Sequence, residues 1–81
     1  MNWAEEYGQG FYVRLISCRR PGEKLHTFCK RGGFRLESLR LWEKTRQFPE
    51  YPLRINDYAD NLGVNPLWLW FRGEIPNFSQ K

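Results

Sequence analysis

Helix-breaking residues divide this chain into short pieces, and their spacing is the feature that most limits its fold. Pro21-Gly22, Gly32-Gly33 and Asn65-Pro66 interrupt the chain, and Pro49 and Pro52 lie between the last two pairs. Glycine and proline end helices and favour turns. Between these breaks, apolar residues recur every three or four positions, which is typical of amphipathic helices, and strand-like alternation is almost absent. The sequence therefore predicts an all-α fold of five short helices.

The breaks also predict where each helix begins and ends. The first helix carries an apolar stripe from Phe11 to Cys18 and should stop near Arg20, before the proline. Gly33 and Gly63 suit the left-handed residue that follows a helix, and Asn65 with Pro66 suits an N-cap and first position. The other helices are expected over about 23–31, about 36–44, from Pro52 to Leu62, and from Pro66 through Phe71.

The size of the chain limits it to one small domain. It has 81 residues, of which 17% are aromatic, enough for a single hydrophobic core. Its apolar runs are far shorter than the roughly 18 residues of a membrane-spanning helix, and no secretory signal is visible, so we expect a cytoplasmic protein. Residues 77–81 are expected to fray.

Catalytic and metal chemistry find little support in the sequence. Two cysteines, Cys18 and Cys29, and the single His26 are too few for a zinc site, so we expect two free, small, buried cysteines and no metal or cofactor. No nucleophile elbow, phosphate-binding glycine loop or His-carboxylate group is present. The sequence favours a binding protein over an enzyme.

The positive charge of the chain is concentrated in its middle. Residues 14–46 carry ten Lys and Arg against three Glu, a net +7, whereas the other residues carry three bases against six acids, a net −3. Because neutralisation of phosphates by Lys and Arg dominates affinity for nucleic acids, this distribution favours a polyanionic partner. The alternative is a solvated face that aids solubility.

Residues 22–42 have the organisation of a helix-turn-helix, whose second helix lies in the major groove of DNA. Gly33 provides the turn, Phe34 fixes the turn to the core, and Cys29 is small enough for a close helix crossing. Leu39 and Trp42 anchor the second helix from behind.

From about Phe11 to Pro76 the chain resembles the lambda-repressor-like (Cro/repressor) helix-turn-helix family. The first part matches the family's spacing at Gly22, Phe28, Cys29, Gly33, Phe34, Leu39, Trp42, Glu43 and Pro49. The second part matches at Ala59, Leu62, Gly63, Val64, Trp68, Leu69, Gly73 and Glu74. The resemblance implies a sequence-specific transcriptional regulator, repressor- or Cro-like and of phage or mobile-element origin, that binds double-stranded operator DNA as a homodimer.

The chain departs from the family pattern at several positions. Leu25 replaces a Gln that usually touches DNA, and Gly32 replaces a core Leu and leaves space for Phe34 to fill. Thr45 stands where the family often has Gly, so the turn out of the third helix must differ. Leu36 and Leu41 are expected on the outer face of that helix, against thymine methyl groups or against a protein. These departures support an alternative function, a module that binds a protein partner instead of DNA.

The resemblance also implies which side chains meet DNA. Base edges would be read by Arg35, Leu36, Glu37 and Arg40, although Glu37 is equally well placed to pair with Arg40 along the helix. Ser38 is a phosphate contact or a simple helix residue. The DNA backbone would meet Lys44, Arg46 and Gln47. Lys24 and Arg31 either contact phosphates or form a solvated face.

The last apolar run, from Trp68 through Trp70 to Phe71, is too continuous for one face of a surface helix. Family members commonly pair through this region, so it is interpreted as a dimer interface within residues 66–78, rimmed by Arg72 and Glu74. In the alternative, Trp3, Tyr7 and the tail cover the run within the monomer.

Overall fold

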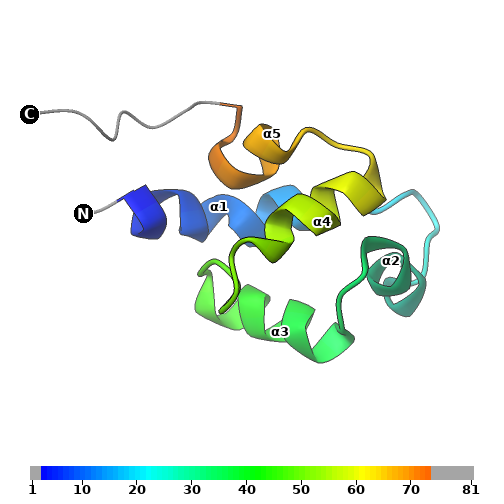
Figure 1. Cartoon of the computed structure of the whole chain (residues 1–81). Coiled ribbons are helices and arrows are strands. Elements are labelled where there is room, and N and C mark those ends of the chain that lie inside the picture. Colours follow the sequence, from blue (N-terminus) through cyan, green and yellow to red (C-terminus); the bar gives the residue numbers. More distant parts are fainter. Residues whose placement is uncertain (1–2, 74–81) are drawn as a thin grey trace, which may run out of the picture.

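The computed structural model describes residues 3–73, and all regular structure within this range is helical (Figure 1). The five helices are α1 (Trp3–Ile16), α2 (Leu25–Gly32), α3 (Leu36–Thr45), α4 (Arg54–Leu62) and α5 (Pro66–Phe71). The prediction of an all-α chain with five short helices is confirmed for this range. Glu74 and residues 77–81, for which we made predictions, lie outside it.

Three predicted helix ends are confirmed, and each is set by residues at the helix end itself. Gly33 (φ 85°) and Gly63 (φ 73°) are left-handed and follow the last residues of α2 and α4. The Asn65 side chain accepts a hydrogen bond from the Leu67 N–H (2.8 Å), and Pro66 is the first residue of α5. These N-terminal and C-terminal signals act within a few residues, so they can be recognised without tertiary contacts.

Three predicted boundaries are wrong. The first helix ends at Ile16 and not near Arg20, because the chain turns there and the Ser17 hydroxyl donates to the Arg14 carbonyl (2.6 Å). The second helix begins at Leu25 and not at Glu23. The fourth begins at Arg54, so that Pro52 lies in the preceding turn, where its carbonyl accepts from the Ile55 N–H (2.9 Å).

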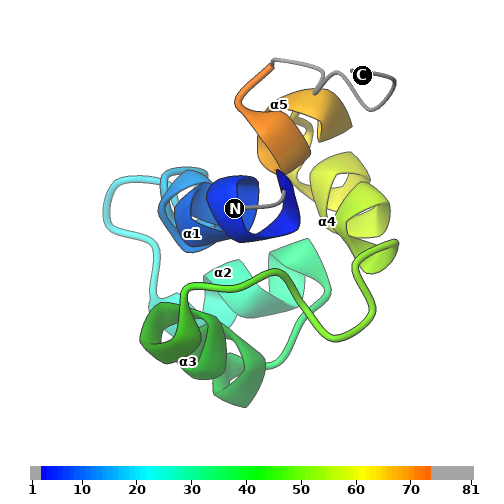
Figure 2. The same cartoon turned by 90° about the vertical axis from the view of Figure 1, so that its left-hand side faces the viewer.

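The helices pack around α1 and α4. Helix α1 contacts α5 and α3, α4 contacts α2 and α5, and α2 contacts α3. Helix α2 is seen end-on in Figure 1 while α3 lies across the view, and the reverse holds in Figure 2, so these two helices cross. In both views α3 and α5 lie at opposite ends of the molecule.

An aromatic core joins these helices. The largest fully buried side chains are Phe11, Phe28, Leu15, Leu39, Ile55 and Leu69. Cys29 is buried as predicted, whereas Cys18 is only partly buried, and both are free thiols. Burial is the main cause that raises the pKa of each thiol. The cysteines therefore act mainly as small packing residues.

Arg14 is the one buried charged residue in the described range, with 7% of its surface exposed. Its guanidinium donates to the carbonyls of Leu69, Trp70 and Tyr7, each at 2.9 Å. Burial lowers its pKa to about 10, and nearby Arg72 contributes to the shift, so the group is still charged at neutral pH. Arg14 thus holds the end of α5 against α1, and its charge is not available to a partner.

Candidate nucleic-acid interface

A three-residue turn joins α2 to α3 and sets how they cross. The N–H groups of Gly33 (2.9 Å) and Phe34 (3.1 Å) both donate to the Cys29 carbonyl, which closes the end of α2. The Asn61 side chain of α4 donates to the Gly32 carbonyl (3.0 Å). The turn is therefore held both by its own backbone and by a neighbouring helix.

Phe34 fixes this turn to the core, as the sequence predicted. Its ring lies edge-on to Phe28, Trp42 and Tyr58, with centroids 5.5, 5.6 and 5.2 Å apart. A Cβ atom built on Gly32 would overlap the Phe34 ring. The prediction that Phe34 fills the space left by Gly32 is confirmed, and this aromatic wedge sets the position of α3.

The exposed side of α3 carries a stripe of polar residues with one leucine. Glu37, Arg40, Leu41 and Lys44 are all exposed and lie at the i, i+3, i+4 and i+7 spacing of one helix face. Leu39 and Trp42 are buried on the opposite side. Two of the four predicted base-reading residues, Glu37 and Arg40, are thus brought together on a surface that a partner can reach.

The beginning of α3 only partly follows the predictions. Arg35 is exposed at the N-cap position, and Ser38 is partly buried. Leu36 is partly buried and packs against the core, so its predicted place on the outer face is wrong. Leu36 is the first residue of α3, and its apolar side chain packs on the core because this contact removes it from water. Leu41 is 55% exposed, which agrees with the prediction for that residue.

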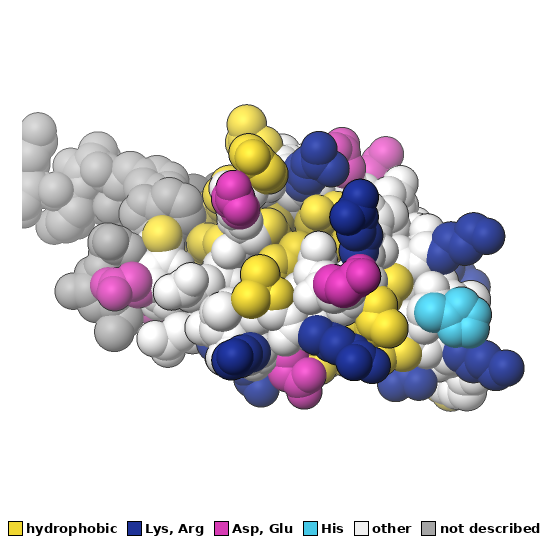
Figure 3. Space-filling model, turned by 90° about the horizontal axis from the view of Figure 1, so that it is seen from below, with side chains coloured by type: hydrophobic (Ala, Val, Ile, Leu, Met, Phe, Trp, Pro, Cys, Tyr) yellow, Lys and Arg dark blue, Asp and Glu magenta, His cyan; other side chains and the backbone are white. Residues whose placement is uncertain are grey.

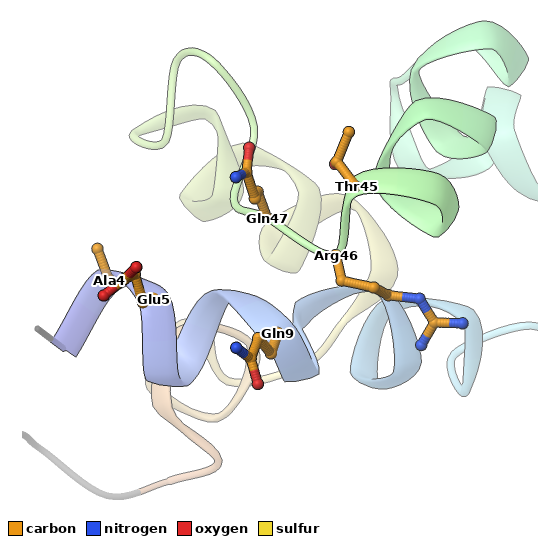
Figure 4. Close-up of a pocket in the computed structure, with 6 residues that line it drawn as sticks. All are labelled: Ala4, Glu5, Gln9, Thr45, Arg46 and Gln47. Atoms are coloured by element: carbon orange, nitrogen blue, oxygen red, sulfur yellow. The ribbon is translucent and has the colours of Figure 1, made fainter. Parts of the chain in front are cut away.

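The end of α3 turns through Arg46, which is left-handed (φ 54°) although it is not glycine. Its Nε donates to the Glu43 carbonyl (2.7 Å), and its guanidinium lies 5.0 Å from the centroid of the Tyr12 ring. The chain therefore leaves α3 through a left-handed residue at Arg46, one position after Thr45. Arg46 and Gln47 are exposed, and they line a hollow of about 410 Å³ between α1 and the end of α3 (Figure 4).

Of the two possible phosphate contacts predicted in the second helix, only one is exposed. Lys24 is exposed and lies at the N-cap of α2. Arg31 forms two hydrogen bonds with the Glu23 carboxylate, both at 2.9 Å, and donates to the Cys18 carbonyl (3.0 Å). The hydrogen bond from Arg31 is the main reason that the pKa of Glu23 is lowered to about 2. We therefore correct the assignment of Arg31, which joins α2 to the loop before it.

Residues 14–46 still expose an excess of positive charge when the bases that bond inside the protein are left out of the count. Of the ten bases in residues 14–46, Arg14 is buried and Arg31 is paired with Glu23, whereas the other eight are exposed, together with two acids, Glu37 and Glu43. Figure 3 views the molecule from the side of α2 and α3 and shows dark-blue basic side chains across that face, with magenta acidic ones between them. The exposed side chains of residues 14–46 are therefore positive on balance.

The aromatic run of α5 is used mostly inside the monomer. Phe71 is buried, so its predicted place in a dimer interface is wrong. The Trp70 indole N–H donates to Asn56 Oδ1 (2.9 Å), and its ring lies 5.1 Å from that of Phe48. Trp68 is partly buried and packs against the core. The Tyr7 ring lies edge-on to Phe71, with centroids 5.3 Å apart, so the alternative in which Tyr7 covers the run within the monomer is confirmed for that residue.

Two features were missed at the sequence level. Arg14 is buried, and its only signal was a charged residue inside the apolar run Phe11–Ile16. The second is a pair of exposed apolar side chains before α4: Leu53 is 77% exposed and Tyr51 is 65% exposed. Their signal was the presence of large apolar residues on both sides of Pro52 in a loop.

Comparison of the chain with models of protein families, with curated proteins and with solved structures finds no match. Within residues 3–73, no helix is both long enough and apolar enough to cross a membrane. No group of three or more His, Cys, Asp or Glu side chains in that range is arranged to hold a metal ion.

Proposed function

We propose that the chain is a helix-turn-helix protein that binds double-stranded DNA with α3 as its recognition helix and regulates transcription. The observation that carries this proposal is the exposed stripe of α3, which is positioned by the Phe34 ring and has exposed basic residues on it and at both of its caps. A helix of this diameter fits the major groove, where each base pair presents a distinct set of donors and acceptors.

Different residues of α3 have different roles in this proposal. Arg40 pairs with guanine O6 and N7, Glu37 accepts from cytosine N4 or orients Arg40, and Leu41 packs on a thymine methyl group. Arg35 approaches the same base edges from the beginning of the helix. Leu36 has no such role, because it is turned toward the core.

A second set of residues positions the protein on the DNA backbone. Lys24, Lys44, Arg46 and Gln47 are exposed at the two ends of the α2–turn–α3 unit. Contacts with phosphates carry no sequence information but supply much of the affinity. Ser38, which is partly buried, is the weakest member of this set.

A homodimer on a two-fold operator stays a prediction. A single small domain reads few base pairs, and two copies double the readout at half-sites about 34–36 Å apart. Helix α5 lies at the far end of the molecule from α3, so pairing near Trp68 leaves α3 free (Figure 1). Sedimentation of the protein with and without duplex measures this stoichiometry.

The experiment starts with selection of bound sequences from a pool of random duplexes, followed by fluorescence anisotropy on the selected duplex and on a scrambled one. Arg40→Ala should cost about 1–3 kcal/mol on the selected duplex only. Arg46→Ala should weaken binding to both duplexes alike and reduce the salt slope by about one. Arg20→Ala removes the same charge from an exposed side chain in the loop between α1 and α2, outside the proposed footprint, and serves as the matched control. The absence of any enriched sequence, or affinity that does not change with salt between about 50 and 200 mM, would refute the proposal.

A further inference from the structure

A groove lies beside the recognition face of α3, between this helix, the loop that follows it and the beginning of α4. Its volume is about 400 Å³. Trp42 and Tyr58, both buried core residues, contribute to its lining, and so do the exposed side chains of Leu41 and Tyr51. The groove is therefore apolar at its base and open to solvent.

The exposed apolar side chains here exceed what the fold needs. Tyr51 is 65% exposed and Leu41 is 55% exposed, and Leu53, two residues after Tyr51, is 77% exposed. None of the three belongs to the core cluster or to the partly buried residues packed on it. Leu41 and Tyr51 both line the groove, so their exposed apolar surfaces lie together there, and exposed apolar patches mark surfaces that another molecule covers.

The charges of the lining decide what kind of molecule fits. Arg35 and Arg54 are exposed and also line the groove, against one exposed acid, Glu50. A second copy of this surface would bring like charges together, which is unfavourable. A phosphate backbone would satisfy the arginines but would leave Leu41 and Tyr51 without an apolar partner. An acidic segment with apolar side chains satisfies both.

We propose that this groove binds an acidic segment of a partner protein, with a Leu or aromatic side chain inserted between Leu41 and Tyr51 and with carboxylates on Arg35 and Arg54. Leu53 extends the apolar contact beyond the groove. Because Arg35 and Leu41 also belong to the proposed DNA-binding face, the segment and the duplex exclude each other. That exclusion rests on the proposed function, whereas binding of the segment does not.

The first test measures binding of a probe in the absence of DNA. The probe is a synthetic 12-residue peptide in which Asp and Glu alternate with Leu and Phe, titrated into ¹⁵N-labelled protein. Two control peptides replace either the apolar residues by Ser or the acidic residues by Lys. We expect saturable shifts at α3 and at residues 49–54 with the probe and none with either control. No saturable shifts with the probe, equal binding of a control peptide, or shifts located on other elements would overturn the proposal.

Variants then assign the binding to the groove. Tyr51→Ser and Arg54→Gln change exposed side chains, so the helical fold should persist by circular dichroism. Each should weaken the probe about tenfold, a size typical of a central interface residue. Val13→Ser, a 52% exposed apolar residue on α1, is the matched control and should leave affinity unchanged. Unchanged affinity for Tyr51→Ser, or a concentration-dependent dimer that Leu53→Ser abolishes, would refute the acidic partner.

A competition experiment between the probe peptide and the selected duplex separates the groove proposal from the DNA-binding proposal. If the DNA-binding proposal holds, the probe should displace the selected duplex, and Tyr51→Ser should prevent displacement. If the protein binds the probe and no duplex, the groove proposal stands and the DNA-binding proposal fails. If the duplex and the probe bind together, their sites are separate, and the shared-face part of the inference is wrong.

Discussion

Replacing Gly32 by alanine tests whether the Phe34 wedge positions α3. Gly32 is the last residue of α2, and alanine inside a helix normally stabilises by up to about 1 kcal/mol relative to glycine. Here the new methyl group would lie 2.9 Å from Phe34 Cζ and closer still to Cε2. Real side chains do not approach so closely, so the ring has to move.

The ring cannot move without losing contacts in the core. Phe34 is packed against three aromatic rings, and overpacking of this kind costs about 1–3 kcal/mol. This cost exceeds the gain in helix propensity. We therefore expect Gly32→Ala to lower the free energy of unfolding by about 1–2 kcal/mol and Tm by about 4–16 °C.

A double-mutant cycle with Phe34→Leu isolates the steric cause. Leucine lacks the Cε2 and Cζ atoms that the new methyl group would meet, although it loses the edge-on aromatic contacts, each worth about 0.5–1.5 kcal/mol. In the Phe34→Leu protein, Gly32→Ala should be neutral or stabilising by up to about 1 kcal/mol. Urea unfolding followed by tryptophan fluorescence measures all four proteins. Equal effects of Gly32→Ala in both backgrounds would show that the Phe34 ring is not the obstacle.

Three further predictions concern single contacts. Arg14→Leu should destabilise by about 1–3 kcal/mol, because it leaves the Leu69 carbonyl buried without a donor, and hydrogen exchange should show earlier opening of α5 than in the parent protein. The lowered pKa of Glu23 means that its contribution to stability is complete at neutral pH and is lost as the pH falls from about 4.5 to about 2. Thermal unfolding at several pH values should therefore lose part of its acid dependence in Glu23→Gln, and an unchanged profile contradicts the pairing with Arg31. Arg46→Gly relieves the left-handed conformation, worth about 1–2 kcal/mol, but loses the cation–π contact with Tyr12, worth about 0.5–1 kcal/mol, so it should stabilise by at most about 1 kcal/mol while it weakens binding to duplex. Chemical denaturation and anisotropy on the same sample separate these two effects.

The helix ends that could be predicted are those controlled by neighbours in sequence. Gly33, Gly63 and the Asn65-Pro66 pair act through backbone conformation and a local hydrogen bond, so the sequence pattern contains the whole cause. The end of α1 was missed although a local bond acts there too. Ser17 bonds to the Arg14 carbonyl three residues earlier and competes with continuation of the helix, but a serine does not mark a helix end as a glycine or proline does.

The candidate site was predicted less completely than the fold, because burial depends on contacts between distant residues. Arg14 and Leu69 meet across 55 positions, and no local pattern distinguishes such an arginine from a surface one. Phe71 was assigned to an interface because its neighbours are apolar, whereas other elements of the monomer cover it. The apolar groove beside α3 was missed for the converse reason, since Tyr51 and Leu53 lie outside the regular apolar spacing of a helix.

Because Arg14 and Arg31 are used inside the protein, the salt dependence expected for DNA binding is smaller than the sequence alone suggests. If all ten bases of residues 14–46 neutralised phosphates, the slope of log affinity against log salt would be about −9 for each protomer, at about 0.9 per phosphate. Arg14 and Arg31 are used inside the protein, and only Lys24, Lys44 and Arg46 lie where a phosphate contact is proposed. Three contacts predict a slope of about −3. Anisotropy titrations over a range of salt concentrations measure it, and a slope near −7, the value for all eight exposed bases of residues 14–46, would mean that the proposed footprint is too small.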